Sequence, residues 1–161
     1  MKILFIQTGG TIDKDYPHTT KGWAFEFGEP SIKRVLSKLD PSFEYEIITA
    51  FKKDSLEVTN ADRQILLDII LQRSENKIII THGTDTMMET GMYLKENVES
   101  KLVVITGAMR PEMFTNSDAD LNIGAAIATA NLKQYGVYLS MHGIVKPIEE
   151  IKRNLETGKY F

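Results

Sequence analysis

Two short polar segments contain the residue types most able to do chemistry. Residues 8–12 (TGGTI) directly follow the apolar run 3–6, and residues 81–86 (THGTDT) directly follow the apolar run 78–80. Ligands and catalytic groups gather at the carboxyl ends of strands in parallel α/β sheets. A threonine hydroxyl becomes a useful nucleophile when an adjacent base activates it. In a chain without cysteine, the two segments therefore predict threonine-based nucleophilic chemistry.

Polar groups also follow two further predicted strands. Asp54 and Ser55 come after the strand expected at 43–51, and residues 107–111 (GAMRP) come after the strand expected at 101–106. In a parallel sheet all four segments lie at one edge, so together they predict one pocket.

The chemistry of this pocket can be read group by group. Gly9 and Gly10 allow the backbone to approach a ligand closely. Thr84 and Asp85 stand where a helix is expected to begin, and the free N–H groups there favour a carboxylate or a developing oxyanion. Asp85 is suited to binding a substrate ammonium group. A desolvated lysine nearby would serve as the base, because burial lowers the pKa of a lysine.

Each group also has a simpler interpretation. The glycines form a turn or a phosphate loop, although the sequence has neither G-x-G-x-x-G nor G-K-[ST], and Asp85 would repel phosphate. Thr84 or Asp85 caps a helix. His82 is a hydrogen-bonded structural residue more often than a base. Other groups have structural alternatives too: Ser55 as a turn residue, Arg110 as an ion-pair partner, and Trp23, Phe25 and Phe27 as a lid or as anchors of the first loop.

The apolar pattern predicts the elements that position these groups. Expected strands are 2–7, 43–51, 77–81, 101–106 and 136–140; expected helices are 30–39, 60–73, 85–96, 118–132 and 148–156; a long loop covers 8–29. Strand runs such as 78–80 and 102–105 are continuously apolar, which indicates burial on both faces and hence parallel pairing. Alternating strands and helices predict an α/β fold, a three-layer Rossmann-like parallel sheet flanked by helices, in a single domain.

Size and composition exclude several classes of protein. The chain has 161 residues and a net charge of −3 without any long basic block, which argues against nucleic-acid binding. Its apolar runs are too short for a membrane span. Its three histidines are scattered, so no metal site is expected. Without cysteines and without an evident leader, the expected location is cytoplasmic.

The three motifs TGGTI, THGTDT and TGAMRP resemble those of the bacterial-type L-asparaginase/glutaminase family. The chain is also similar to short single-domain asparaginase-like proteins that share TGGTIDK and KDSLE. The resemblance covers nearly the whole chain, but it corresponds only to the larger N-terminal domain of the family, so we expect the C-terminal domain of the family to be absent.

The resemblance implies an acyl-enzyme route: attack on a side-chain amide, release of ammonia, then hydrolysis. It implies that Thr11 is the nucleophile, Thr84 the second catalytic threonine and Asp85 the acid that binds the substrate amino group. Substrate binding is expected from Gly10, Asp54, Ser55, Gly83 and Ala108. The resemblance further implies a small asparagine-like amide substrate, no cofactor and no metal, and a homodimer or higher homo-oligomer.

Two positions depart from the family pattern. Tyr16 is the one candidate for the lid tyrosine, and it lies only five residues after Thr11. The catalytic lysine corresponds to Lys152 or to Arg153; we expect Lys152, because an arginine stays protonated and cannot act as a base. These departures leave an alternative function open, a non-catalytic or weakly catalytic module that binds aspartate or asparagine.

Overall fold

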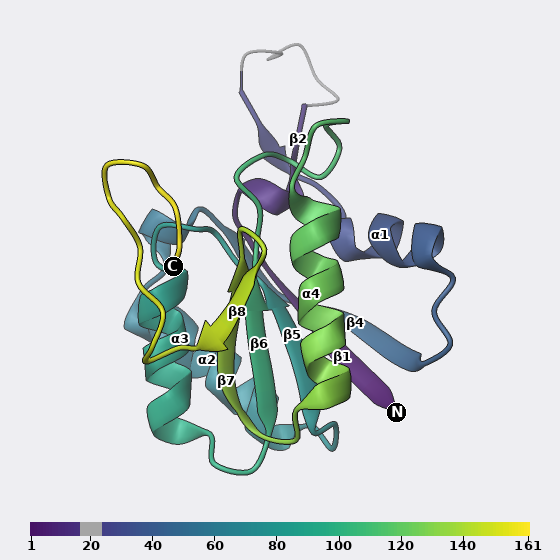
Figure 1. The fold of residues 1–161 in the computed structure, drawn as a ribbon, viewed down its shortest axis with the longest axis vertical. Coiled ribbons are helices and arrows are strands. Elements are labelled where there is room, and N and C mark those ends of the chain that lie inside the picture. The colour runs from purple at the N-terminus through teal and green to yellow at the C-terminus, as the bar shows by residue number, and fades with distance from the viewer. Residues whose placement is uncertain (17–23) are drawn as a thin grey trace.

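A six-stranded sheet forms the centre of the fold (Figure 1). The computed structural model describes residues 1–16 and 24–161. The sheet order is β4-β1-β5-β6-β7-β8. Its strands are β1 (Lys2–Gly9), β4 (Glu44–Lys53), β5 (Lys77–Thr81), β6 (Leu102–Thr106), β7 (Gly136–Met141) and β8 (Ile144–Pro147). The first five strands of this order are parallel, and β8 pairs with β7 antiparallel. A small antiparallel pair, β2 (Lys14–Asp15) and β3 (Glu26–Phe27), lies in the first loop.

Four helices cover the two faces of the sheet. They are α1 (Ser31–Leu39), α2 (Asn60–Gln72), α3 (Met87–Asn97) and α4 (Ala119–Leu132). Helices α1 and α4 pack on one face and α2 and α3 on the other, as Figure 1 shows. The predicted three-layer α/β fold in a single domain is confirmed.

The middle strands show why the sheet is buried on both faces. Ile78 and Ile80 pack into the core beneath α2 and α3, whereas Ile79 packs into the core beneath α1 and α4. Successive side chains of a strand point to opposite faces, so a run of three isoleucines serves both layers. The apolar run thus carries the signal of a doubly covered strand.

One predicted element is wrong. Residues 148–156, all of which the structure describes, do not form a helix; after β8 the chain makes turns and an antiparallel contact near its end. Lys152 and Phe161 exchange two backbone hydrogen bonds of 2.9 Å each. Ile148 and Ile151 are buried as a helical stripe would require, but Leu155 is 89% exposed. We name residues 152–161 the C-terminal hairpin.

Within residues 1–16 and 24–161, no helix has the length and apolar character needed to cross a membrane.

Candidate active site

Three loops touch at the carboxyl edge of the sheet. A Cβ atom added to Gly10 would come within 2.4 Å of the Gly83 Cα, and one added to Gly83 would come within 2.6 Å of the Ser55 Cβ. Gly10 also has a φ of +80°, a value that glycine adopts without strain. The loops after β1, β5 and β4 are therefore in direct contact. Gly10 and Gly83 leave no room for a side chain at these two points.

Hydrogen bonds from several elements hold the turn that contains Thr11. Thr11 is partly buried in a single 3-10 turn, Thr11–Asp13. The Gly10 N–H donates to the Lys53 carbonyl over 3.0 Å. The buried Asp13 carboxyl accepts from the Ser31 N–H at the start of α1 (2.8 Å) and from the Thr81 hydroxyl (3.3 Å). Burial raises the pKa of Asp13. These contacts fix the Thr11 turn between β4, β5 and α1.

Ser55 links the loop after β4 to the loop that contains Thr84. Its buried hydroxyl accepts a hydrogen bond from the Asp85 N–H (3.2 Å), and its carbonyl accepts one from the Thr86 hydroxyl (2.6 Å). Because the Ser55 oxygen accepts from the Asp85 N–H, its own O–H is directed elsewhere and can donate to an anionic ligand.

Asp54, the second polar residue of this loop, is held in an ion pair. Its Oδ2 lies 2.8 Å from the Lys14 Nζ, and the hydrogen bond from Lys14 lowers the pKa of Asp54. Its Oδ1 accepts from the Leu56 N–H over 3.2 Å. Asp54 thus stabilises the turn that presents Ser55.

His82 is a structural residue in this arrangement. It is fully buried, with its Nδ1 2.8 Å from the Gly83 carbonyl and its Nε2 3.0 Å from the Thr90 hydroxyl. Arg63 donates to the same hydroxyl over 3.2 Å. Burial lowers the pKa of His82 to about 4. A neutral ring that donates from Nδ1 and accepts at Nε2 satisfies the whole chain of bonds, and it holds the Gly83 backbone in place.

The carbonyl of Thr84 accepts two hydrogen bonds from the C-terminal hairpin. It accepts from Arg153 Nη1 (2.9 Å) and from the Tyr160 hydroxyl (2.7 Å). The same Arg153 nitrogen lies 3.2 Å from Asp85 Oδ1. Burial raises the pKa of Tyr160 to about 12, so its hydroxyl remains a donor at neutral pH. Residues far apart in sequence thus shape the backbone at Thr84 and Asp85.

The structure places Arg153, and not Lys152, beside Asp85. Lys152 is exposed and pairs through its backbone with Phe161, whereas Arg153 faces Asp85. The physical reason is the extended, antiparallel geometry of this segment, in which neighbouring side chains point to opposite sides. The side chain that reaches the site is therefore a permanently charged guanidinium.

Tyr16 lies in an aromatic cluster on the first loop. Its ring centroid is 5.0 Å from that of Phe25 and 6.3 Å from that of Phe114. Phe27 lies under the Lys14 ammonium group, 5.8 Å from its ring centroid. Trp23, which the sequence offered as a lid or an anchor, lies outside the described residues. Tyr16 and Phe25 pack against each other and against Phe114, and they are 55% and 45% exposed.

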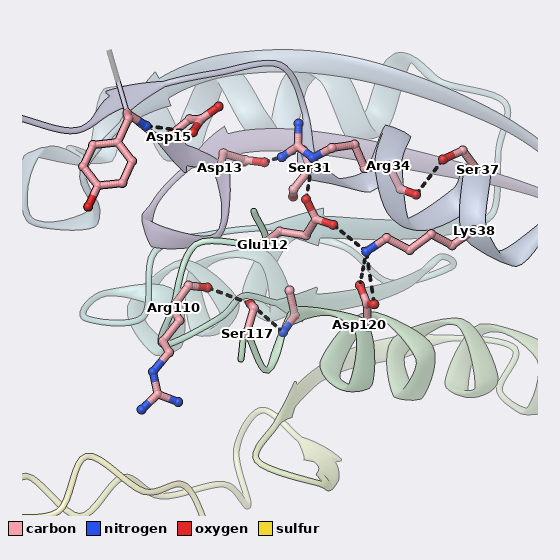
Figure 2. Close-up of polar contacts among 12 residues, drawn as sticks. Asp13, Asp15, Ser31, Arg34, Ser37, Lys38, Arg110, Glu112, Ser117 and Asp120 are labelled. Carbon is pink, nitrogen blue, oxygen red and sulfur yellow. Dashed lines mark hydrogen bonds and ion pairs between the residues drawn. The ribbon is translucent and has the colours of Figure 1, made fainter. Parts of the chain in front are cut away.

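The loop after β6 contains the buried Ala108. The Asp118 carboxylate accepts from the Met109 N–H (3.0 Å) and the Arg110 N–H (3.2 Å). Asn122 of α4 donates to the Gly107 carbonyl over 3.0 Å. Figure 2 shows the Arg110 guanidinium pointing away from the nearby ion pairs. The hydrogen bonds of Asp118 and Asn122 thus fix the backbone of this loop.

Sequence reasoning missed an ion-pair cluster that joins this loop to α1. Figure 2 shows the buried Glu112 between Arg34 (2.5 Å) and Lys38 (2.8 Å), with Lys38 also reaching Asp120 (3.2 Å). The Glu112 N–H donates to the Ile12 carbonyl over 3.1 Å, so the cluster touches the Thr11 turn. The sequence signal that could have indicated this cluster is the pair of cations Arg34 and Lys38, which lie four residues apart on one helical face.

Among the residues that the structure describes, no group of three or more histidine, cysteine, aspartate or glutamate side chains is placed to hold a metal ion.

The sequence of the chain is similar to known proteins. A sequence model of the family described as "Asparaginase, N-terminal" matches residues 2–155. A glutaminase-asparaginase from Acinetobacter glutaminasificans is 26% identical over 166 aligned residues, which cover 95% of this chain and 50% of the relative. An L-asparaginase from Bacillus subtilis is 28% identical over 136 residues, which cover 80% of this chain and 36% of the relative.

The fold has solved counterparts as well. The thermostable L-asparaginase from Thermococcus kodakarensis superposes with a TM-score of 0.85 and 25% identity, over 95% of this chain and 48% of that one. The chain thus spans about half the length of the full-length relatives that it matches over 95% of its own length.

Proposed function

The chain belongs to the asparaginase family, and from this premise we propose that it is an amidohydrolase acting on the side-chain amide of asparagine or a related small carboxamide. The observation that supports this most directly is the contact of three loops at one sheet edge, through Gly10, Gly83 and Ser55. These loops carry Thr11 and Thr84, two hydroxyl groups of the type the chemistry needs.

In the proposed reaction the Thr11 hydroxyl attacks the amide carbon. The hydroxyl proton passes to a base and then to the leaving nitrogen, so that ammonia departs and an acyl-Thr11 ester remains. Water then attacks the ester and regenerates Thr11. We propose that backbone N–H groups of the loops that contain Gly10 and Gly83 stabilise the oxyanion, and that the Ser55 hydroxyl binds a substrate carboxylate. Tyr16 is proposed to activate Thr11.

The second half of the site is proposed to comprise Thr84 with Asp85. Asp54 supports Ser55, and Ala108 lines the opposite wall through its backbone. Lys152 stays the proposed base, although it is exposed and Arg153 occupies the place beside Asp85. Side-chain approach of Lys152 would require the C-terminal hairpin to rearrange when substrate binds.

Arg153 also favours a second candidate function. An arginine stays protonated and cannot accept the proton of a threonine. A site that combines two threonine residues with a fixed cation is suited to binding a small carboxylate without turning it over. We therefore retain a binding module for aspartate or asparagine as the alternative.

Ammonia release separates the two functions. Wild-type protein is incubated with asparagine, glutamine and a panel of small carboxamides, beside Thr11→Val and Thr84→Val. We expect turnover of at least one amide, reduced roughly a thousandfold or more by either substitution. A wild-type protein that gains thermal stability with aspartate or asparagine but releases no ammonia from any amide would instead support the binding module.

A further inference from the structure

The carboxylate expected to bind a substrate ammonium group already has a cationic partner. Arg153 Nη1 lies 3.2 Å from Asp85 Oδ1, and the two side chains are 17% and 49% exposed. A bare carboxylate at this point would attract an ammonium group. With Arg153 beside it, the local charge is close to neutral, and a further cation would approach the guanidinium as well as the carboxylate.

Arg153 is held in this position by more than the ion pair. Its Nη1 donates to the Thr84 carbonyl (2.9 Å), its Nε donates to the Gly158 carbonyl (3.4 Å), and its guanidinium lies 5.4 Å from the centroid of the Tyr160 ring. Planar guanidinium groups stack well on aromatic faces. The cation is therefore a fixed part of the site and differs from a mobile surface pair, which contributes little.

Tyr160 in turn anchors the stacking surface. The residue is buried, its hydroxyl donates to the Thr84 carbonyl over 2.7 Å, and its N–H donates to His142 Nδ1 over 3.3 Å. Arg153 and Tyr160 form a backbone bridge with each other. The C-terminal hairpin thus delivers its positive charge to the loop of Thr84 and Asp85 as a preformed unit.

From this geometry we propose that the site selects small carboxamides that carry a carboxylate but lack an ammonium group, such as the monoamide of a simple dicarboxylic acid. Arg153 acts as the specificity-determining residue: it neutralises Asp85 and favours negative charge. The inference about turnover rests on the proposed amidohydrolase function, whereas the inference about ligand charge does not.

Binding of two dicarboxylates that differ only in the ammonium group tests the proposal. Titration calorimetry measures succinate and L-aspartate on the wild-type protein. We expect succinate to bind at least about threefold more tightly than L-aspartate, the scale of a partly exposed charge interaction. Wild-type protein that binds L-aspartate more tightly, or binds neither compound, overturns the proposal.

Variants identify the responsible residue. Arg153→Gln should shift the preference toward L-aspartate by about three- to tenfold, while Arg153→Lys keeps the charge and should keep the preference for succinate. Lys159→Gln is the matched control, because it removes an equal charge from an exposed side chain of the same hairpin and should leave the preference unchanged. An equal shift in Lys159→Gln and Arg153→Gln contradicts the assignment to Arg153.

Turnover distinguishes this inference from the proposed function. Succinamate should be hydrolysed with a higher kcat/KM than asparagine. No ammonia from either amide, with the binding preference for succinate intact, would contradict the amidohydrolase and leave the ligand class standing. Efficient turnover of asparagine in preference to succinamate would support the amidohydrolase and contradict the proposed ligand class.

Discussion

At the scale of single residues, the site is built around backbone groups whose positions depend on buried side chains. Ser55 receives the Asp85 N–H, His82 fixes the Gly83 carbonyl, and Arg153 with Tyr160 fixes the Thr84 carbonyl. His82 and Arg153 are themselves ordered by further hydrogen bonds, to the Thr90 hydroxyl and to the Gly158 carbonyl. Their arrangement gives Thr11 and Thr84 a rigid frame, which a catalytic constellation requires.

Arg153→Lys is expected to increase turnover. A lysine paired with Asp85 is positively charged near neutral pH, but unlike an arginine it can release its proton as the pH rises and then act as a base. At alkaline pH, kcat for the best amide should therefore rise by about tenfold or more, and the pH profile of kcat should gain a limb that ascends through the pKa of this lysine. The measurement is ammonia release against pH, with Lys152→Arg as the control. An unchanged or lower kcat in Arg153→Lys would contradict the idea that the lack of a base beside Asp85 limits the reaction.

The buried His82 predicts a loss of stability in mild acid. Its pKa falls from 6.5 to about 4 in the folded protein because burial disfavours the charged ring. The unfolded chain therefore binds one more proton between these values, so the stabilisation is complete above about pH 6.5 and is lost as the pH falls. We expect the free energy of unfolding to drop by about 2 kcal/mol between about pH 7 and about pH 4.5.

Urea denaturation across this pH range measures the effect. His82→Gln removes the titrating group, so its lower stability should vary much less with pH than that of the wild type. The carboxylates of Asp62 and Glu75 have pKa values lowered to about 2 from 3.8 and 4.5. Their stabilisation starts to fall only near the acid end of this range and is the same in both proteins, so the difference between the two slopes reports on His82. Equal slopes in the two proteins would assign the acid sensitivity to another group.

The placement of the candidate residues could be predicted from the sequence where the signal is local. Thr11, Ser55, Thr84 and Asp85 lie within short motifs at strand ends, and the structure places their loops in contact. Arg153 was ambiguous because the choice between two neighbouring residues depends on whether the segment is helical or extended. Tyr160 and Glu112 carried no local signal, since their roles arise from contacts with residues far away in sequence.

At the scale of elements, the strands and helices around the site follow from local pattern. The runs of β5 and β6, and the capping box formed by Thr59 and Asp62 at the start of α2, are explicit in the sequence. The helix expected at 148–156 failed because Ile148 and Ile151 fit a helical stripe, while the backbone pairing of Lys152 with Phe161 depends on a contact across the hairpin. Tertiary pairing overrides a short periodic pattern of this kind.

The cluster centred on Glu112 is expected to stabilise the contact of α1 with the loop after β6. Hydrogen bonds from Lys38 and Arg34 lower the pKa of Glu112 although burial raises it. Glu112→Gln removes the charge that satisfies two cations and should lower the free energy of unfolding by about 2 kcal/mol. Asp120→Asn, which changes an exposed partner of Lys38, should cost about 0.5 kcal/mol or less. Chemical denaturation compares the two; equal costs would show that burial of Glu112 is unimportant.

At the scale of the whole molecule, the parallel sheet gathers the loops of the site at one edge (Figure 1). The α/β class could be predicted because strands and helices alternate along the chain. The antiparallel edge strand β8 could not, because residues 144–147 are only half-buried and lack the continuous apolar character of the inner strands. The edge matters for function, since the C-terminal hairpin follows it.

A homodimer remains our prediction for the assembly. Helix α4 exposes Leu121 (78%) and Leu132 (80%), which lie three helical turns apart and so on one side of the helix. Covering such side chains favours association. Light scattering should give about twice the chain mass of 18.2 kDa, and Leu132→Glu should shift the protein toward monomer. A wild-type protein that stays monomeric at all concentrations tested would contradict this prediction.

The central claim is that Thr11 forms an acyl-enzyme, and trapping with hydroxylamine tests it most directly. An acyl-Thr11 ester partitions between water and hydroxylamine, so the wild type should convert succinamate or asparagine partly to the hydroxamate while ammonia release continues. Thr11→Val should form neither product, and Lys152→Gln measured in parallel reports on the proposed base. Hydroxamate formed equally by wild type and Thr11→Val, or a wild type that binds succinate yet yields no ammonia and no hydroxamate, would contradict the threonine mechanism.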